Sequence, residues 1–309
     1  MKLLKRVVPD DFNLFMIGCD HEGSRLRSKK GFDKMINMVK SEYEGVLSHY
    51  NYVIHHGDFM DAITYLDRRF DTKSQRETDL VKQLDNSIEN LLPIKDNLIT
   101  VCESNHLFKV RATSMFTERL CEKLKKEGSK VEYGTQMVKI KFIDVNGKQM
   151  LNTFHLHGQK AVSSSVDEIE RRKINMKLTV KRQLREKCGD AVLMSKGHSH
   201  KLLVLPPSQK MYLSDDGDKI SREYTLPHYL KRQFVDDNKE SNKPKIITDG
   251  SRWIHPDDRW YVNAGSFLTS YGDGYSGYAE AAEYDPIELG FAVAKIRNRA
   301  IEDVVPIYL

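Results

Sequence analysis

The chain has few of the features that mark membrane, secreted or repetitive proteins. Among its 309 residues, no apolar run approaches the roughly 20 residues of a membrane-spanning helix. Residues 1–6 have neither the apolar core nor the small-residue cleavage site of a signal peptide. The four cysteines, Cys19, Cys102, Cys121 and Cys188, are too scattered to predict a disulfide framework. The sequence therefore predicts a cytoplasmic protein that does not associate with a membrane.

The composition is that of an ordinary globular protein. Hydrophobic residues make up 39% of the chain and charged residues 30%, which excludes a disordered protein. The net charge of +5 is unevenly spread, because residues 160–190 hold nine Lys or Arg against five Asp or Glu. A basic surface attracts anionic substrates such as nucleic acid. The same pattern is also typical of a solvated helix face, so charge alone does not establish the substrate.

The first third of the chain alternates between strand and helix patterns. Short apolar runs at residues 13–18, 52–54 and 98–102 predict buried strands. Apolar positions at helical spacing over residues 32–49 and a polar segment over residues 73–92 predict the helices between them. Such alternation is typical of a sheet with helices on its faces. Polar residues follow each run, at the strand ends where open α/β sheets carry their sites.

The rest of the chain predicts a hairpin, a long helix and further strands. These elements cover residues 137–143 and 149–157 (a hairpin around Asn146-Gly147), 162–187 (a charged helix), and 191–195 and 287–308 (strands). Residues 206–260 are rich in Pro, Asp, Asn, Ser and Lys, and we expect an inserted loop or cap over residues 201–260. The whole chain, residues 1–309, is predicted to form one domain.

Five short blocks of polar residues follow the apolar runs. In order they read Cys19-Asp20-His21, Gly57-Asp58-Phe59-Met60-Asp61, Ser104-Asn105-His106, His157-Gly158 and Gly197-His198-Ser199-His200. Imidazole is a ligand for Zn, Fe and Mn, and two ions about 3.5–4 Å apart form a site that hydrolyses phosphate esters. A single block would more often be turn chemistry. Five in succession predict a two-metal site.

The chemistry of such a site suggests a role for several of these residues. One carboxylate must be shared by both ions, and Asp58 is the best candidate. Asn105 would supply its amide oxygen. His106 would protonate the leaving oxygen, and Asp61 would orient His106 and favour its charged form.

The five blocks resemble the motifs of calcineurin-like metallophosphoesterases, which read D-x-H, G-D-x-x-D, G-N-H-[DE], a later His and G-H-x-H. The resemblance covers residues 13–200, and residues 263–266 resemble the N-P-G-S turn that often follows. It implies an α/β fold, a four-layer metallophosphoesterase-type α/β/β/α sandwich, here with an inserted loop or cap region. It also implies two divalent ions (Mn, Fe or Zn). The first ion would be held by Cys19, His21, Asp58 and His200, the second by Asp58, Asn105, His157 and His198, with Asp61 and His106 as the catalytic pair.

Two positions depart from the family pattern. Cys19 stands where D-x-H has its metal-binding Asp, and a similar Cys occurs in the RNA lariat debranching enzymes of this superfamily. A thiolate would shift the preference towards zinc or iron. Asp20 is the alternative ligand through a register change, and we favour Cys19. The other departure is at the third motif, where Ser104 replaces Gly and Leu107 replaces the acid, which removes no metal ligand.

The resemblance implies a phosphodiesterase or nuclease that hydrolyses nucleic-acid or nucleotide phosphodiester bonds through a metal-bridging hydroxide. The basic segment 160–190, the expected insertion and Cys19 favour this reading, and the overall texture resembles phosphoesterases encoded by bacteriophages. A small-molecule phosphomonoesterase is an alternative. Protein Ser/Thr phosphatases are disfavoured, because they carry Arg after G-D-x-x-D where this chain has Ala62. A catalytically silent scaffold of the same fold is a third alternative, disfavoured by the nearly complete ligand set.

Overall fold

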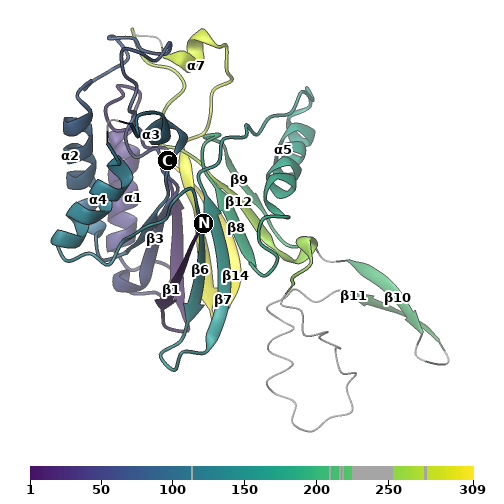
Figure 1. Ribbon diagram of the computed structural model, residues 1–309. Helices are drawn as coiled ribbons and strands as arrows, with labels where there is room; N and C mark the ends of the chain where they lie inside the picture. Colours follow the sequence, from purple (N-terminus) through teal and green to yellow (C-terminus); the bar gives the residue numbers. More distant parts are fainter. Residues whose placement is uncertain (113, 209, 216, 218, 225–252, 275–276) are drawn as a thin grey trace.

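The chain forms an α/β structure with two large sheets (Figure 1). This computed structural model describes residues 1–112, 114–208, 210–215, 217, 219–224, 253–274 and 277–309. Each large sheet has six strands, and a separate two-stranded hairpin joins β10 (Met211–Asp215) to β11 (Ile220–Tyr224). The predicted α/β class is confirmed at this level.

The first sheet has the order β14-β13-β2-β3-β4-β5. Its strands are β2 (Phe12–Ile17), β3 (Asn51–His55), β4 (Leu98–Val101), β5 (Glu132–Tyr133), β13 (Gly290–Arg297) and β14 (Ala300–Tyr308). The strands from β2 to β5 run parallel, and β13 pairs antiparallel with both β2 and β14. The carboxyl ends of β2, β3 and β4 therefore lie at one edge of the sheet.

The second sheet has the order β1-β6-β7-β8-β12-β9. Its strands are β1 (Lys2–Val7), β6 (Met137–Ile143), β7 (Gln149–Leu156), β8 (Leu193–Lys196), β9 (Leu202–Leu205) and β12 (Trp260–Ala264). β6 and β7 form the antiparallel hairpin that the Asn146-Gly147 turn predicted. β7, β8 and β12 run parallel, so their carboxyl ends also share one edge.

The two sheets pack face to face around an apolar core. In β2, Leu14 and Met16 belong to the cluster that also contains Ile140 and Val262 of the second sheet. Phe15, one position along, faces the other way into the cluster of the outer helices. A strand buried on both faces reads as a continuous apolar run, which explains the pattern at residues 13–18.

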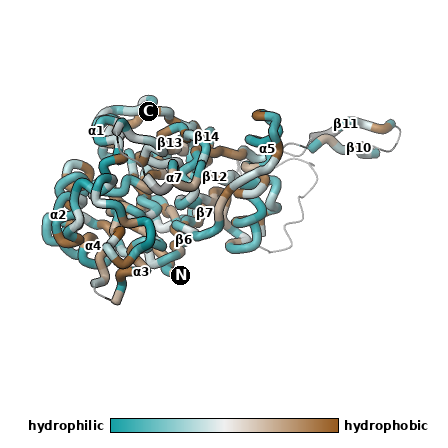
Figure 2. Tube along the Cα trace, turned by 90° about the horizontal axis from the view of Figure 1, so that it is seen from above, coloured by the Kyte–Doolittle hydropathy of each residue, from teal (hydrophilic) through white to brown (hydrophobic). Residues whose placement is uncertain are grey.

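Helices cover the outer faces of this sandwich (Figures 1 and 2). α1 (Lys29–Lys40), α2 (Leu80–Leu91) and α4 (Phe116–Lys126) pack on the first sheet, and α5 (Ile169–Leu184) packs on the second. The short helices α3 (Asn105–Lys109) and α7 (Tyr278–Ala281) lie in connecting segments. Within the described part of the chain, no helix is long and apolar enough to cross a membrane.

Three helices are shorter than the sequence pattern predicted, and one of them is α5, which covers residues 169–184 of the predicted 162–187. α1 ends at Lys40, and the apolar positions at 46 and 47 belong instead to a tight turn in which Tyr43 and Val46 pair. α2 begins only at Leu80, where the Asp79 side chain accepts hydrogen bonds from the first backbone N–H groups of the helix. Val46 is buried there and Leu47 is exposed, so apolar residues can continue a helical pattern past the end of a helix.

The expected insertion at residues 201–260 is only partly described. Residues 202–205 form β9, which is a strand of the second sheet and not part of a loop. The β10–β11 hairpin follows and extends away from the two large sheets (Figures 1 and 2). Residues 225–252 lie outside the described residues.

Candidate metal centre

The predicted site residues all follow the carboxyl ends of parallel strands. Cys19 and His21 come after β2, Asp58 after β3 and Asn105 after β4. The remaining histidines follow β7 and β8 of the second sheet. Backbone hydrogen bonds join the first two loops, since the N–H of Cys19 donates to the Gly57 carbonyl at 2.9 Å. Segments far apart in sequence are thereby brought to one end of the sandwich.

The first cluster contains the four residues expected to hold the first ion. The donor atoms of Cys19, His21, Asp58 and His200 all lie within 4.8 Å of one another. The Nε2 atoms of His21 and His200 face each other at 3.1 Å. Two imidazole nitrogens directed at one point, beside a thiol and a carboxylate, are close enough to bind one metal ion.

The second cluster shares Asp58 with the first. Donor atoms of Asp58, His157 and His198 lie within 4.8 Å of one another. Asn105 Oδ1 lies 2.6 Å from His157 Nε2 and 3.1 Å from His198 Nδ1, so the amide oxygen belongs to the same group. The predicted second ligand set is therefore brought together, with Asp58 common to both clusters.

Hydrogen bonds at the outer ring nitrogens orient two of the imidazoles. His21 Nδ1 donates to the Asp61 carboxylate at 2.9 Å, and His157 Nδ1 donates to the His56 carbonyl at 2.8 Å. Each bond leaves the Nε2 lone pair directed into the cluster. The Nε2 of His157 also lies 3.1 Å from Asp58 Oδ2. A metal ion bound by both atoms would stabilise two electron-rich donors placed this close together.

The Asp58 side chain contributes donor atoms to both clusters. Its Oδ1 atom is buried and has no hydrogen-bond partner among the described residues. Burial by itself raises the pKa of Asp58, but the neighbouring imidazoles of His157, His106 and His21 lower this pKa well below its usual range. An ionised, buried oxygen without a donor is costly, and a bound metal ion would satisfy it.

The backbone is strained at five of the predicted ligands. Eleven non-glycine residues of the described chain have positive φ, and five of them are Cys19 (55°), His21 (51°), Asp58 (51°), His198 (73°) and His200 (56°). The left-handed region is unfavourable for residues with a side chain. Strain of this kind collects at functional sites, where the surrounding structure holds it in place.

Cys19, and not Asp20, lies among the donor atoms of the first cluster. Its Sγ accepts a hydrogen bond from the backbone N–H of His198 at 3.4 Å. Asp20 is directed elsewhere, because its carboxylate accepts from His55 Nε2 at 2.9 Å and lies 3.8 Å from Arg27. Burial raises the pKa of the Cys19 thiol, so a nearby cation would be needed to stabilise the thiolate.

The Asp61 carboxylate lies within 4.8 Å of His106, where it favours the charged form of that imidazole, but its hydrogen bonds go to other residues. That carboxylate accepts hydrogen bonds from His21 Nδ1 and, at 2.8 Å, from Gln75 Nε2. The N–H of Asp61 donates to the Glu22 carbonyl at 2.9 Å, which ties the loop after β3 to the loop after β2 and brings the carboxylate beneath His21. His106 is held instead by the Asp61 backbone carbonyl, 2.6 Å from its Nδ1.

Arg69 is a further residue of the site, which the sequence patterns missed. Its Nη1 donates to His106 Nε2 at 3.0 Å, while its Nε and Nη2 pair with the Asp67 carboxylate at 2.9 and 2.7 Å. His106 is therefore neutral, with its proton on Nδ1, and burial lowers its pKa further. Arg69 lies in the irregular segment before α2 and belongs to no motif, so only its charge could have drawn attention to it.

The turn at residues 263–266 contacts the site through Cys19. The hydroxyl of Ser266 donates to the Cys19 carbonyl at 2.9 Å, and the N–H of Phe267 donates to the same oxygen at 3.1 Å. Asn263 Oδ1 accepts from the Ser199 hydroxyl at 3.0 Å, between the two histidines of the last block. This turn therefore holds both ends of the first cluster.

A chain of buried polar groups lies behind the second cluster. His56 Nδ1 donates to the Ile17 carbonyl at 3.0 Å, and the Ser195 hydroxyl lies 2.6 Å from His56 Nε2 and 2.6 Å from His155 Nδ1. His155 Nε2 lies 2.7 Å from the Thr153 hydroxyl. Burial lowers the pKa of His56 to about 3 and that of His155 well below its usual range. Both rings are neutral and serve to support the strands that carry the ligands.

Comparison of the chain with protein-family models gives no match, and a search of curated proteins also gives none. The chemistry of the site is therefore inferred from its own side chains. Burial lowers the pKa of His198 to about 4 and also lowers that of His200, which keeps these imidazoles in the neutral form that binds metal. Nitrogen, oxygen and sulfur donors together suit Zn, Fe or Mn.

Proposed function

We propose that this protein is a metallophosphoesterase that uses two divalent ions to hydrolyse phosphodiester bonds of nucleic acids or nucleotides. The observation that carries the proposal is the position of Asp58 between two donor clusters, with one buried oxygen lacking any hydrogen-bond donor among the described residues. A carboxylate shared by two metal positions is the central requirement of a two-metal hydrolytic site. A site for a single ion would need only one of these two donor clusters.

The residues of the two clusters would hold the ions, which when bound would activate a water molecule and neutralise charge on the phosphoryl oxygens. His106 lies at the edge of the first cluster, with its ring centroid 5.0 Å from that of His21. Arg69 donates to the Nε2 of His106. A phosphoryl oxygen that accepts this guanidinium N–H would release His106 Nε2, which could then take up the proton given off by the attacking water and pass it to the leaving oxygen.

Two features favour a diester substrate over a monoester. Ala62 follows Asp61, so the chain has no arginine at that position that could bind the terminal phosphate of a monoester. Three lysines, Lys160, Lys187 and Lys196, line a cavity that adjoins the second cluster. Such a cationic surface outside the metal ligands suits a substrate that extends beyond the phosphate being cleaved.

The direct test compares hydrolysis of bis-p-nitrophenyl phosphate and p-nitrophenyl phosphate by protein loaded with Mn, Fe or Zn. We expect metal-dependent turnover with preference for the diester, abolished in Asp58→Asn. The matched control is Asp33→Asn, on the exposed face of α1, which should retain activity. Preference for the monoester would make the protein a phosphomonoesterase. No turnover of either ester, of DNA or of RNA with any of these metals would overturn the proposal in favour of a silent scaffold.

A further inference from the structure

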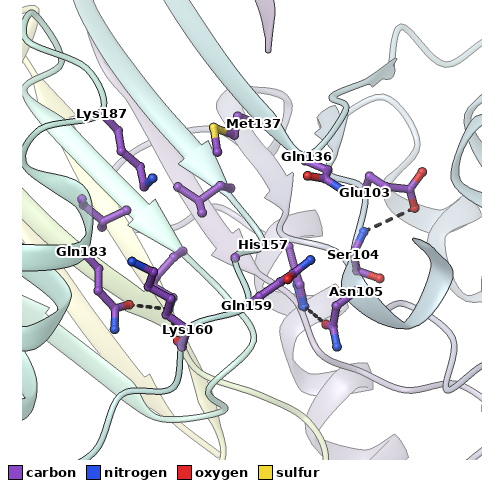
Figure 3. Close-up of a pocket in the computed structure, with 14 residues that line it drawn as sticks. Glu103, Ser104, Asn105, Gln136, Met137, His157, Gln159, Lys160, Gln183 and Lys187 are labelled. Carbon is purple, nitrogen blue, oxygen red and sulfur yellow. Dashed lines mark hydrogen bonds between the residues drawn. The ribbon is translucent and has the colours of Figure 1, made fainter. Parts of the chain in front are cut away.

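A cavity opens directly beside the second metal cluster. Asn105 and His157 line it and at the same time belong to the cluster, and Figure 3 shows the hydrogen bond that joins them at one side of the cavity. Its volume is about 300 Å³. Small-ligand sites range over roughly 300–1,000 Å³, so the space suits one compact group and not a long polymer.

The cavity wall carries an excess of positive charge. Three lysines, Lys160, Lys187 and Lys196, line it against one carboxylate, Glu103. Both oxygens of that carboxylate already accept hydrogen bonds. Oε1 accepts one from the Thr117 hydroxyl at 2.8 Å, and Oε2 accepts one from the Tyr133 hydroxyl at 2.9 Å. Glu103 lies across the cavity from Lys160 and Lys187 (Figure 3). The charge that remains available to a ligand is positive.

Lys196 forms part of the cavity wall and is held there by hydrogen bonds. Its side chain is buried, with only 1% of the residue exposed. The Nζ atom donates to the Lys160 carbonyl at 2.6 Å and to Gln183 Oε1 at 2.7 Å. An ammonium group has three donors, and no carboxylate among the described residues forms an ion pair with this one. A buried cation without an anion is unfavourable, and a bound anionic group would compensate it.

The remaining wall is aliphatic with amide groups at the rim. Met137, Leu156 and Leu184 supply the apolar surface, while Gln136 and Gln159 each carry a donor and an acceptor. This combination suits a flat heterocycle with a polar edge, which packs on the aliphatic side chains and hydrogen bonds to the amides. No Phe, Tyr or Trp is among the described lining residues, so recognition would not depend on stacking against those rings.

We propose that this cavity binds the nucleoside on one side of the scissile phosphate, and that Lys160, Lys187 and Lys196 contact the next phosphate along the strand. The substrate is then a nucleic-acid strand and not a small diester. This inference rests on the proposed phosphodiesterase activity, because the adjoining metal cluster must hold the phosphate that is cleaved.

The first test compares two substrates of the metal-loaded protein. Bis-p-nitrophenyl phosphate has neither a nucleoside nor a second phosphate, whereas the 5′-phosphorylated thymidine dinucleotide has both. We expect Lys187→Ala to raise KM for the dinucleotide about ten-fold, the loss of roughly one charged contact, and to change kcat/KM for the small diester by less than about two-fold. Lys173→Ala is the matched control, since Lys173 is an exposed lysine of α5 outside the cavity wall.

A second variant tests whether the open volume of the cavity is needed to bind the dinucleotide. Gln159→Trp places a large ring at an exposed position of the cavity rim, where folding should be unaffected. It should raise KM for the dinucleotide and leave the small diester unchanged. Effects on the dinucleotide no larger than those of Lys173→Ala, or equal effects on both substrates, would overturn the proposal.

Calorimetry with mononucleotides separates this inference from the proposed activity. Thymidine and adenosine 5′-monophosphate should bind the wild-type protein more tightly than inorganic phosphate does, and Lys187→Ala should weaken that binding. This result would stand even if neither ester, DNA nor RNA were hydrolysed, in which case the phosphodiesterase proposal fails and the cavity remains a nucleotide-binding site. Equal binding of nucleotide and phosphate, or no effect of Lys187→Ala, would remove the cavity as a nucleoside site.

Discussion

The Asp61 carboxylate accepts a hydrogen bond from Nδ1 of His21 at 2.9 Å and thereby supports a predicted metal ligand. We expect Asp61→Asn to weaken binding at the first metal position by about 10–100-fold, as loss of a carboxylate behind a metal-bound histidine does. Metal content after dialysis against a graded chelator measures this. Asp67→Asn is the control, because Asp67 pairs with Arg69 and contacts no ligand of the first cluster. Full metal content together with lost turnover would instead place Asp61 in proton transfer.

Cys19 and Asp20 can be separated by the same measurement. Cys19→Ala should lose the first ion, because its Sγ is one of the four donor atoms of that cluster. Asp20→Asn should keep both ions and lower the free energy of unfolding by about 1–3 kcal/mol, since the buried His55 loses a charged partner. Metal analysis and denaturant unfolding give the two readouts. Retention of metal in Cys19→Ala with loss in Asp20→Asn would reverse the assignment.

His106 should act on the reaction and not on metal binding. His106→Asn is expected to lower kcat by about 10²–10⁴-fold, the usual contribution of an acid–base group, with metal content unchanged. In this structure the Arg69 guanidinium donates to His106 Nε2. When substrate binds, it is expected to donate to the substrate phosphate, so Arg69→Ala should raise KM. Loss of metal in His106→Asn would show that this imidazole is a ligand.

Stability should fall in acid because of buried neutral histidines. His155 and His56 have folded-state pKa values below the ordinary 6.5, about 3 in the case of His56. The unfolded chain takes up protons at these rings as the pH falls below about 6.5, whereas the folded protein does not, so the free energy of unfolding decreases from pH 7 towards pH 4. In His155→Gln this slope should be smaller by up to about 1.4 kcal/mol per pH unit.

Urea unfolding of the metal-free protein between pH 7.5 and 4.5 measures that slope. The other buried histidines contribute equally to wild type and His155→Gln, so their contribution cancels when the two slopes are subtracted. The control His49→Gln alters an exposed ring and should leave the slope as in the wild type. An identical slope in His155→Gln would mean that His155 also titrates in the folded protein.

Local pattern was sufficient for much of the fold. The apolar run at residues 13–18 predicted β2, and the Asn146-Gly147 turn predicted the β6–β7 hairpin, because strand period and turn chemistry are properties of neighbouring residues. The pattern failed where apolar residues continue past a helix end, as at residues 46–47. The expected insertion at residues 201–260 also included β9, an apolar run that pairs with β12.

For the candidate site, too, some features follow from local sequence and others depend on the tertiary structure. The sequence by itself determined which donors are available and that each follows a buried run, since residue type and order suffice for that. Only the tertiary structure decided which atoms meet: that Cys19 and not Asp20 faces Asp58, that the Asp61 carboxylate supports His21, and that a lysine-lined cavity adjoins Asn105. These contacts join residues tens to hundreds of positions apart, and their geometry depends on how two separate sheets pack, which no local pattern encodes.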